Sequence, residues 1–212
     1  MVLRKIMGLF VCVLVIGSAA FATAGIPDPT ETTATMPNVD TSDDLALFNL
    51  PNGQGRPFND AQIKNDGTSV DAHIEMIVRD AFGAPVANFP REDMWLVSAD
   101  GGLVSCSGGT TADLNTDSEG FTQWVSPLSA GGYSTDVCVV YVNGLALTGA
   151  PFTLFFNSAD MNGDGVVNLV DIGRFTAAYI GDYNFSADFS ADGVLNLVDI
   201  GRLSGAMGAT CP

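Results

Sequence analysis

Two stretches of the sequence space their oxygen-bearing side chains in a way that suits a hard metal ion. Residues 160–171 read DMNGDGVVNLVD, and residues 188–199 read DFSADGVLNLVD. Each follows the calcium-loop template, with acidic or polar residues at positions 1, 3 and 5, glycine at position 6 and a carboxylate at position 12. The glycine permits the sharp turn that lets position 7 offer its carbonyl oxygen. The sequence therefore predicts two Ca²⁺ sites.

The expected ligands are of the same kind in both loops. The first ion would be held by Asp160, Asn162, Asp164, the Val166 carbonyl, Asn168 and Asp171. The second would be held by Asp188, Ser190, Asp192, the Val194 carbonyl, Asn196 and Asp199. An ordinary acidic surface would scatter its charge, whereas six of the seven acidic residues after position 157 occupy loop positions 1, 5 and 12.

A short helix is expected to leave each loop. Asn168 and Asn196 are good N-caps, which places the aspartate at position 12 three residues into the helix, near its positive end. Apolar residues then recur at helical spacing until Gly181 or Gly208, where a helix would stop. No apolar segment of helical period precedes either loop, so the entering helix of an ordinary EF-hand is missing.

Two tandem loop–helix units with Asp at position 12 resemble a type I dockerin over residues 158–208. The resemblance implies a small all-α module that binds two calcium ions and attaches a secreted protein to a cohesin-like partner. In that family, positions 10 and 11 carry a Ser-Thr-like pair that recognises the cohesin. Here those positions hold apolar residues, so partner specificity does not carry over. They are candidates for either internal packing or partner binding: Leu169, Val170, Leu197 and Val198.

The first 24 residues are predicted to be a secretion signal peptide. Arg4 and Lys5 precede an apolar core at 6–16, and Ala-Thr-Ala at 22–24 suits cleavage. The apolar run of about 17 residues is shorter than the ~20 that a membrane-spanning helix needs, which disfavours a membrane anchor. We expect an exported protein, extracellular or at the cell surface, whose mature chain spans no membrane.

The charge of the chain excludes some classes of partner. Removing the signal peptide takes away two cations and no acids, so the formal net charge moves from −16 to −18. Such a protein repels nucleic acid and anionic membranes. Residues 25–45, rich in Thr, Pro and Asp, are predicted to form a flexible acidic linker.

Residues 46–157 predict a β-sandwich, so the expected fold class is mainly β followed by a small all-α module at 158–212. Apolar and polar residues alternate through 71–79, which is typical of a half-buried strand. Short strands separated by turns suit a single two-layer domain of about 110 residues. The expected strands lie at 72–78, 94–97, 103–106, 121–125, 137–142, 145–147 and 152–156.

Two segments of this region resemble a bacterial immunoglobulin-like domain of the invasin/intimin kind. Residues 78–86, VRDAFGAPV, are similar to the strand and turn of that family, and residues 116–121, TDSEGF, to its hairpin. The resemblance implies a spacer or adhesion module without catalytic function.

The mature chain has three cysteines, at 106, 138 and 211. In an exported protein, Cys106 and Cys138 on flanking β elements are the expected disulfide. Cys211 is then free, paired between molecules, or the partner of one of the other two.

These features predict a non-enzymatic secreted protein whose C-terminal module anchors an immunoglobulin-like domain. The one histidine, His73, lies on the polar face of a predicted strand, and no catalytic motif appears. The alternative is a carbohydrate-binding or accessory subunit of an extracellular polysaccharide-degrading system. In that case Trp95, Trp124 and Tyr133 would stack on sugar rings, although a core or rim position in a sandwich is the favoured interpretation of each tryptophan.

Overall fold

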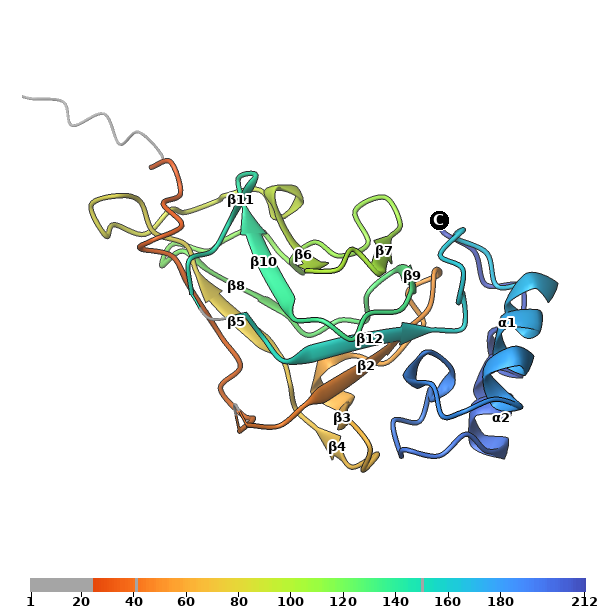
Figure 1. Ribbon diagram of the computed structural model, residues 1–212. Helices are drawn as coiled ribbons and strands as arrows, with labels where there is room; N and C mark the ends of the chain where they lie inside the picture. Colours follow the sequence, from red (N-terminus) through yellow and green to blue (C-terminus); the bar gives the residue numbers. More distant parts are fainter. Residues whose placement is uncertain (1–24, 41, 150) are drawn as a thin grey trace, which may run out of the picture.

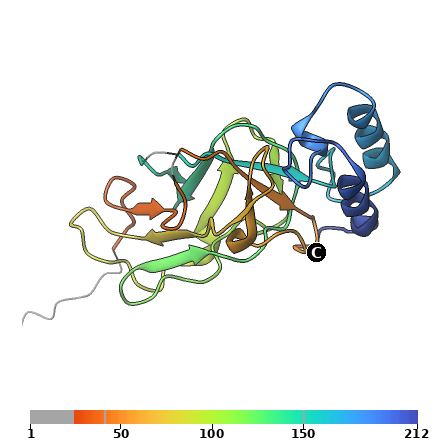
Figure 2. The same cartoon turned by 90° about the horizontal axis from the view of Figure 1, so that it is seen from below.

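The computed structural model of the protein describes residues 25–40, 42–149 and 151–212, so the predicted signal peptide lies outside the described residues (Figure 1). The described chain is mainly β, and its two α-helices lie together at one end of the β region, in Figure 1 and again in Figure 2. Within the described ranges, no helix has the length and apolar character needed to cross a membrane.

Short strands make up most of the β region. They are β1 Thr33–Thr35, β2 Leu45–Asn49, β3 Ala61–Ile63, β4 Ser69–Val70, β5 Ile74–Ile77, β6 Met94–Ser98, β7 Leu103–Ser105, β8 Phe121–Trp124, β9 Ala130–Gly132, β10 Cys138–Val142, β11 Leu145–Ala146 and β12 Leu154–Ser158. The α-helices are α1 Leu169–Tyr179 and α2 Leu197–Ala206. Single 3₁₀ turns occur at η1 Phe58–Asp60, η2 Arg91–Asp93 and η3 Phe185–Ala187.

Two antiparallel sheets enclose the main core. One has the order β1-β5-β8 and the other the order β11-β10-β6. A third sheet, β12-β2-β3-β4, and the ribbon β7-β9 complete the β region. This arrangement supports the predicted β-sandwich of immunoglobulin-like type. The predicted alternation along β5 is also confirmed, because Ala72, Ile74, Met76 and Val78 are all fully buried.

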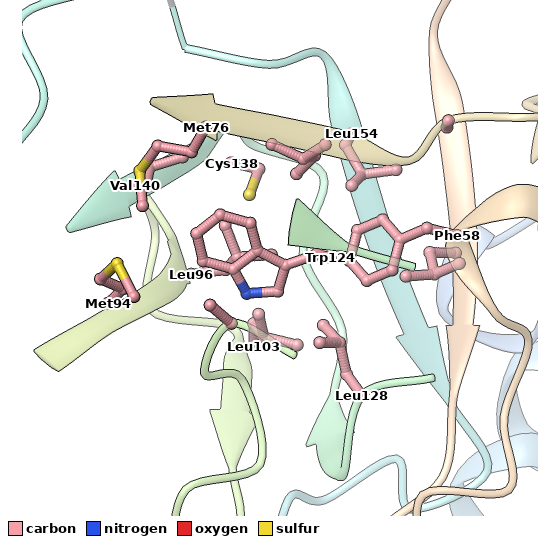
Figure 3. Close-up of a cluster of buried hydrophobic side chains, with 14 of the residues drawn as sticks. Phe58, Met76, Met94, Leu96, Leu103, Trp124, Leu128, Cys138, Val140 and Leu154 are labelled. Atoms are coloured by element: carbon pink, nitrogen blue, oxygen red, sulfur yellow. The ribbon is translucent and has the colours of Figure 1, made fainter. Parts of the chain in front are cut away.

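Trp124 lies at the centre of this core. Figure 3 shows its indole among Met94, Leu96, Leu103 and Leu128. The side chain is fully buried, and its Nε1–H donates a 3.1 Å hydrogen bond to the carbonyl of Thr110. A tryptophan in this position serves packing, so it cannot belong to an exposed sugar-stacking surface.

The strands β2 and β12 form a parallel pair that is buried on both faces. Every residue of the two strands is buried, and Leu45 is paired with Leu154 in register. Because side chains alternate along a strand, one face of the pair supplies Leu45 and Leu47 to the sandwich core. The other face supplies Phe48 to a second core that it shares with the two helices. The pair therefore separates two cores and belongs to both.

The segment 25–45 is not the flexible linker that its composition predicted. Within it, β1 pairs antiparallel with β5, with Thr33 opposite Ile77. Ala34, Met36 and Val39 pack against the sandwich core. The prediction was wrong because an open sheet edge can accept almost any extended segment, and composition gives no sign of such an edge.

The disulfide also differs from the predicted pair. Cys106 is bonded to Cys211, with a Cα–Cα distance of 5.6 Å, and Cys138 is free and buried on β10. Burial raises the pKa of the Cys138 thiol, which keeps it protonated and unreactive. The C-terminal tail makes the observed bridge possible, because the Cys211 N–H donates to the Gly165 carbonyl at 2.9 Å. The tail thereby carries Cys211 back to the β region.

The bridge closes a large loop, with the two cysteines 105 positions apart in the sequence. Cys211→Ser should lower the free energy of unfolding by about 4 to 5 kcal/mol, since so long a loop strongly restricts the unfolded chain. Urea denaturation followed by tryptophan fluorescence would measure the change. Cys138→Ala is the control that leaves the bridge intact, and a peptide joining Cys106 to Cys138 in non-reducing mass mapping would contradict the assignment.

Candidate metal centre

The first loop is organised around the carboxylate of Asp160. This side chain is fully buried. Its Oδ1 accepts hydrogen bonds from the N–H groups of Gly163 and Asp164, at 2.9 and 3.2 Å. Its Oδ2 accepts a bond from the Gly165 N–H at 2.9 Å. The chain therefore wraps around position 1, and Gly165, with φ of +84°, makes the turn expected at position 6.

The carboxylate at position 12 closes the loop and starts the helix. Asp171 Oδ2 accepts from the Asn168 N–H at 2.8 Å, and the Asn168 side chain accepts from the Val170 N–H at 2.8 Å. The Asn168 side chain also accepts from the Asp171 N–H. This bond and the reciprocal bond from the Asn168 N–H to Asp171 form a capping box at the start of α1, which confirms the predicted N-cap. Asp171 Oδ1 also accepts from the Asn162 N–H at 3.2 Å, which ties the helix start to position 3 of the loop.

The second loop repeats this pattern. Asp188 accepts N–H bonds from Asp192 at 3.2 Å and from Gly193 at 2.9 Å. Asp199 accepts from Ser190 at 2.9 Å and from Asn196 at 3.0 Å, and it closes the same capping box at the start of α2. The two loops, which repeat each other in sequence, therefore also share the same pattern of backbone hydrogen bonds.

Buried negative charge marks both loops. Burial raises the pKa of Asp160, and the nearby charges of Asp171 and Asp164 raise it further against the backbone N–H bonds that lower it. Burial likewise raises the pKa of Asp199, with the Asp188 charge adding to the effect. Both burial and mutual repulsion therefore oppose ionisation, and a bound cation would relieve both.

The donor set of each loop fits calcium in its chemistry. It combines carboxylates with amide, hydroxyl and carbonyl oxygens, which are the ligands that Ca²⁺ prefers. No group of three or more His, Cys, Asp or Glu side chains in the described part of the chain is already placed to hold a metal ion. Internal hydrogen bonds occupy some of the donor oxygens instead, as where Asn162 Nδ2 donates to Asp164 Oδ2 at 2.8 Å. Binding an ion would exchange such bonds for coordination.

The four residues at loop positions 10 and 11 are exposed. Leu169 and Leu197 are each 78% exposed, while Val170 and Val198 are 53% and 51% exposed. Of the two roles predicted for them, the structure therefore excludes internal packing. They lie in the first turns of α1 and α2, between the N-cap asparagine and the aspartate that closes each capping box. We name this set, Leu169, Val170, Leu197 and Val198, the helix-start pairs.

An apolar groove runs between the two helices. Its volume is about 300 Å³, and the residues that line it are Ile172, Phe175, Thr176, Tyr179, Ile200, Leu203, Ser204 and Met207. The predicted apolar stripes of both helices contribute to it, and Phe175 and Leu203 are buried at its base. The stripes thus serve mainly to join the helices to each other and to the β region.

The helices are packed on the β region through aromatic residues that sequence reasoning did not single out. Phe48 of β2 lies 5.2 Å from Phe189 between ring centroids, and Phe175 of α1 lies 5.6 Å from Phe189. The Arg202 guanidinium of α2 lies over the Phe48 ring at 5.8 Å. The apolar run at 45–50 was the available signal, since continuous apolar stretches are typical of strands buried on both faces.

Comparison with known proteins adds little to this geometry. No protein-family model matches the chain, and no curated protein matches it. Among solved structures, the filamin domain of Lin-41 matches with a TM-score of 0.30 and 16% sequence identity, over 62% of this chain and 97% of that one. A likeness of this size carries no argument, so the inferences below rest on the geometry of the chain itself.

Calcium binding can be tested one loop at a time. Asp164→Ala and Asp192→Ala each remove the carboxylate at position 5, which is not part of a capping box. Each variant should lower the calorimetric stoichiometry from two calcium ions to one, and the double variant should bind none, because Ca²⁺ affinity depends on the number of charged ligands. Asp182→Ala removes an exposed carboxylate outside both loops and should leave two ions bound. Equal stoichiometry in all variants would contradict the assignment.

Proposed function

We propose that this chain is a secreted, non-enzymatic anchoring protein whose C-terminal part is a dockerin-like calcium module. The single observation that carries the proposal is the arrangement at the start of the two helices. Each helix begins with an exposed Leu-Val pair, and each pair directly precedes the position-12 aspartate that closes the capping box of that same helix. We infer from these two equivalent, exposed apolar pairs that they bind a protein partner.

The geometry links calcium to the binding surface. Asp171 is both the position-12 carboxylate of the first loop and the residue that closes the capping box of α1. An ion held by this carboxylate would fix the first turn of the helix, where Leu169 and Val170 project. Asp199 has the same two roles for α2. Calcium would therefore order both helix-start pairs at once, which makes partner binding calcium-dependent.

The partner that fits this surface is a protein with an apolar face, of cohesin type. The helix-start pairs are uncharged, so recognition would come from apolar burial and shape. The strongly negative chain disfavours nucleic acid and anionic membranes as partners. The exported location and the role of the sandwich as the anchored module belong to the same proposal.

The carbohydrate-binding alternative gains no support from the aromatic residues proposed for it. Trp124 is fully buried in the sandwich core. Trp95 is partly buried and stacks on Tyr141, with ring centroids 5.6 Å apart. Tyr133 alone of the three is substantially exposed. The three aromatic side chains therefore do not form a common platform for a sugar chain.

Partner binding is tested by placing charge in the helix-start pairs. The double variant Leu169→Asp and Leu197→Asp should lower cohesin affinity by at least about 30-fold, because the loss of a hot-spot side chain at the centre of an interface costs about 2 kcal/mol or more. The measurement is surface plasmon resonance against a panel of purified cohesin modules, with and without calcium. Ile180→Asp is the matched control, since Ile180 is as exposed, at 79%, but lies at the other end of α1.

Calcium binding by the same double variant is the second readout of this experiment. The double variant should still bind two calcium ions, because the changed side chains are not ligands. Binding that is unaffected by the double variant, or that does not depend on calcium, would contradict the proposal.

Chelation is expected to destabilise the described chain as one unit. An all-α module that folded independently would melt separately from the sandwich, but Phe48 and Leu50 of the β region share a core with both helices. Calcium at about 100 times its dissociation constant would add roughly 2.7 kcal/mol per site. Differential scanning calorimetry should therefore show one transition, which shifts to lower temperature in chelator. Two transitions, of which only one depends on calcium, would show that the shared core does not couple the two parts.

A further inference from the structure

The first residue of the second loop is held by residues outside that loop. Asp188 is fully buried, and its carbonyl oxygen accepts a 2.6 Å bond from Nδ2 of Asn157 on β12. Its carboxylate Oδ2 accepts a 2.8 Å bond from the hydroxyl of Tyr183, which lies between α1 and the loop. Neither contact follows from the calcium-loop template. Both therefore need a separate explanation.

The Tyr183 hydroxyl also lies against the β region. It is 3.2 Å from Oδ1 of Asn65, in the turn between β3 and β4. A hydroxyl has one proton, so it donates to only one of these two oxygens, and the carboxylate is the stronger acceptor. The same turn packs against the loop at Gly67, where an added Cβ would lie 3.2 Å from Cβ of Asp192. Tyr183 thus occupies the contact between the sandwich and the second loop.

Tyr183 lies near the carboxylates that are proposed as calcium ligands in the second loop. Partial burial and the hydrogen bond to Asp188 raise the pKa of the phenol, and the charges of Asp188, Asp192 and Asp199 raise it further. A tyrosine hydroxyl ordinarily carries its proton at neutral pH, so it is available as a hydrogen-bond donor. All three of these aspartates are carboxylates of the second loop.

The first loop has no equivalent donor. The position that corresponds to Tyr183, 28 residues earlier, holds Phe155, which is buried in a separate cluster and has no hydroxyl. Within the described residues, the Asp160 carboxylate accepts hydrogen bonds from backbone N–H groups alone. The contact that the first loop makes with the sandwich is through its backbone, where the Gly132 N–H donates to the Asp160 carbonyl at 2.7 Å. The Asp188 carboxylate therefore has a tyrosine donor that the Asp160 carboxylate lacks.

We propose that Tyr183 is a positioning residue for the second calcium site: its hydroxyl fixes the Asp188 carboxylate between the loop and the β3–β4 turn. This inference rests on the proposed calcium function. Groups that hydrogen-bond to a metal ligand orient it and commonly change metal affinity by about 10- to 100-fold. Tyr183 therefore raises the calcium affinity of the second site, while the first site does not use it.

The experiment changes Tyr183 in proteins that retain only one loop. Tyr183→Phe removes the hydroxyl and keeps the ring, and it is made in the Asp164→Ala protein, which keeps the second loop, and in the Asp192→Ala protein, which keeps the first. Calorimetric titration with CaCl₂ should show about 10-fold weaker binding at the second loop. It should show no change at the first loop, which serves as the internal control.

A second measurement separates positioning from general stability. The melting temperature of each protein in chelator should be the same with Tyr or Phe at position 183, because the hydroxyl acts on the ion site and the ring packing is kept. A fall in that temperature with equal weakening of both loops would mean a merely structural role and would overturn the inference. Unchanged affinity at the second loop would overturn it as well.

The outcome also distinguishes this inference from the function on which it rests. If the two single-loop proteins that retain Tyr183 bind no calcium, the proposed function fails, and the inference fails with it. If they bind calcium and Tyr183→Phe has no effect, the inference alone fails.

Discussion

The structure depends on one parallel pair of strands that is buried on both faces. Along β2, Leu45 and Leu47 point into the sandwich, while Phe48 points into the core that contains the helices. Each fully buried Leu or Phe side chain contributes about 1.5 to 3 kcal/mol of burial free energy, so neither core can lose this pair without a large loss of stability. The helical part is short and could not bury enough apolar surface alone. The helical part is stable because Phe48 of the sandwich completes its hydrophobic core.

Three further features hold the helical part to the β region. The bridge from Cys106 to Cys211 joins the C-terminal tail to the β region, and the tail itself lies along the first loop. Gly132 of β9 and Asn157 of β12 each donate a hydrogen bond to the carbonyl of a position-1 aspartate. Both loops are therefore supported from the β side, through different donors. Folding of the loops and docking on the sandwich are in this way physically coupled.

The position-12 aspartates illustrate how one group can serve both structure and function. Asp171 and Asp199 close the capping boxes that start α1 and α2, and they are also the position-12 carboxylates of the two loops. The buried carboxylate at position 1 of each loop is satisfied by backbone N–H groups that also shape the turn. The negative charges gathered in each loop repel one another, and a bound divalent cation would offset this repulsion.

Local patterns in the sequence determined the two loops, their N-caps, the helices and the alternation of β5, because each depends on residues a few positions apart. The sequence alone did not reveal that β1 joins a sheet or that β2 and β12 pair, since these contacts join distant segments. The disulfide partner followed from the tail pairing with the first loop, and spacing between cysteines contains no such information. Exposure of Leu169 and Leu197 was also undecided until the helices were docked. Tertiary packing decides these features, because it alone determines which faces are covered.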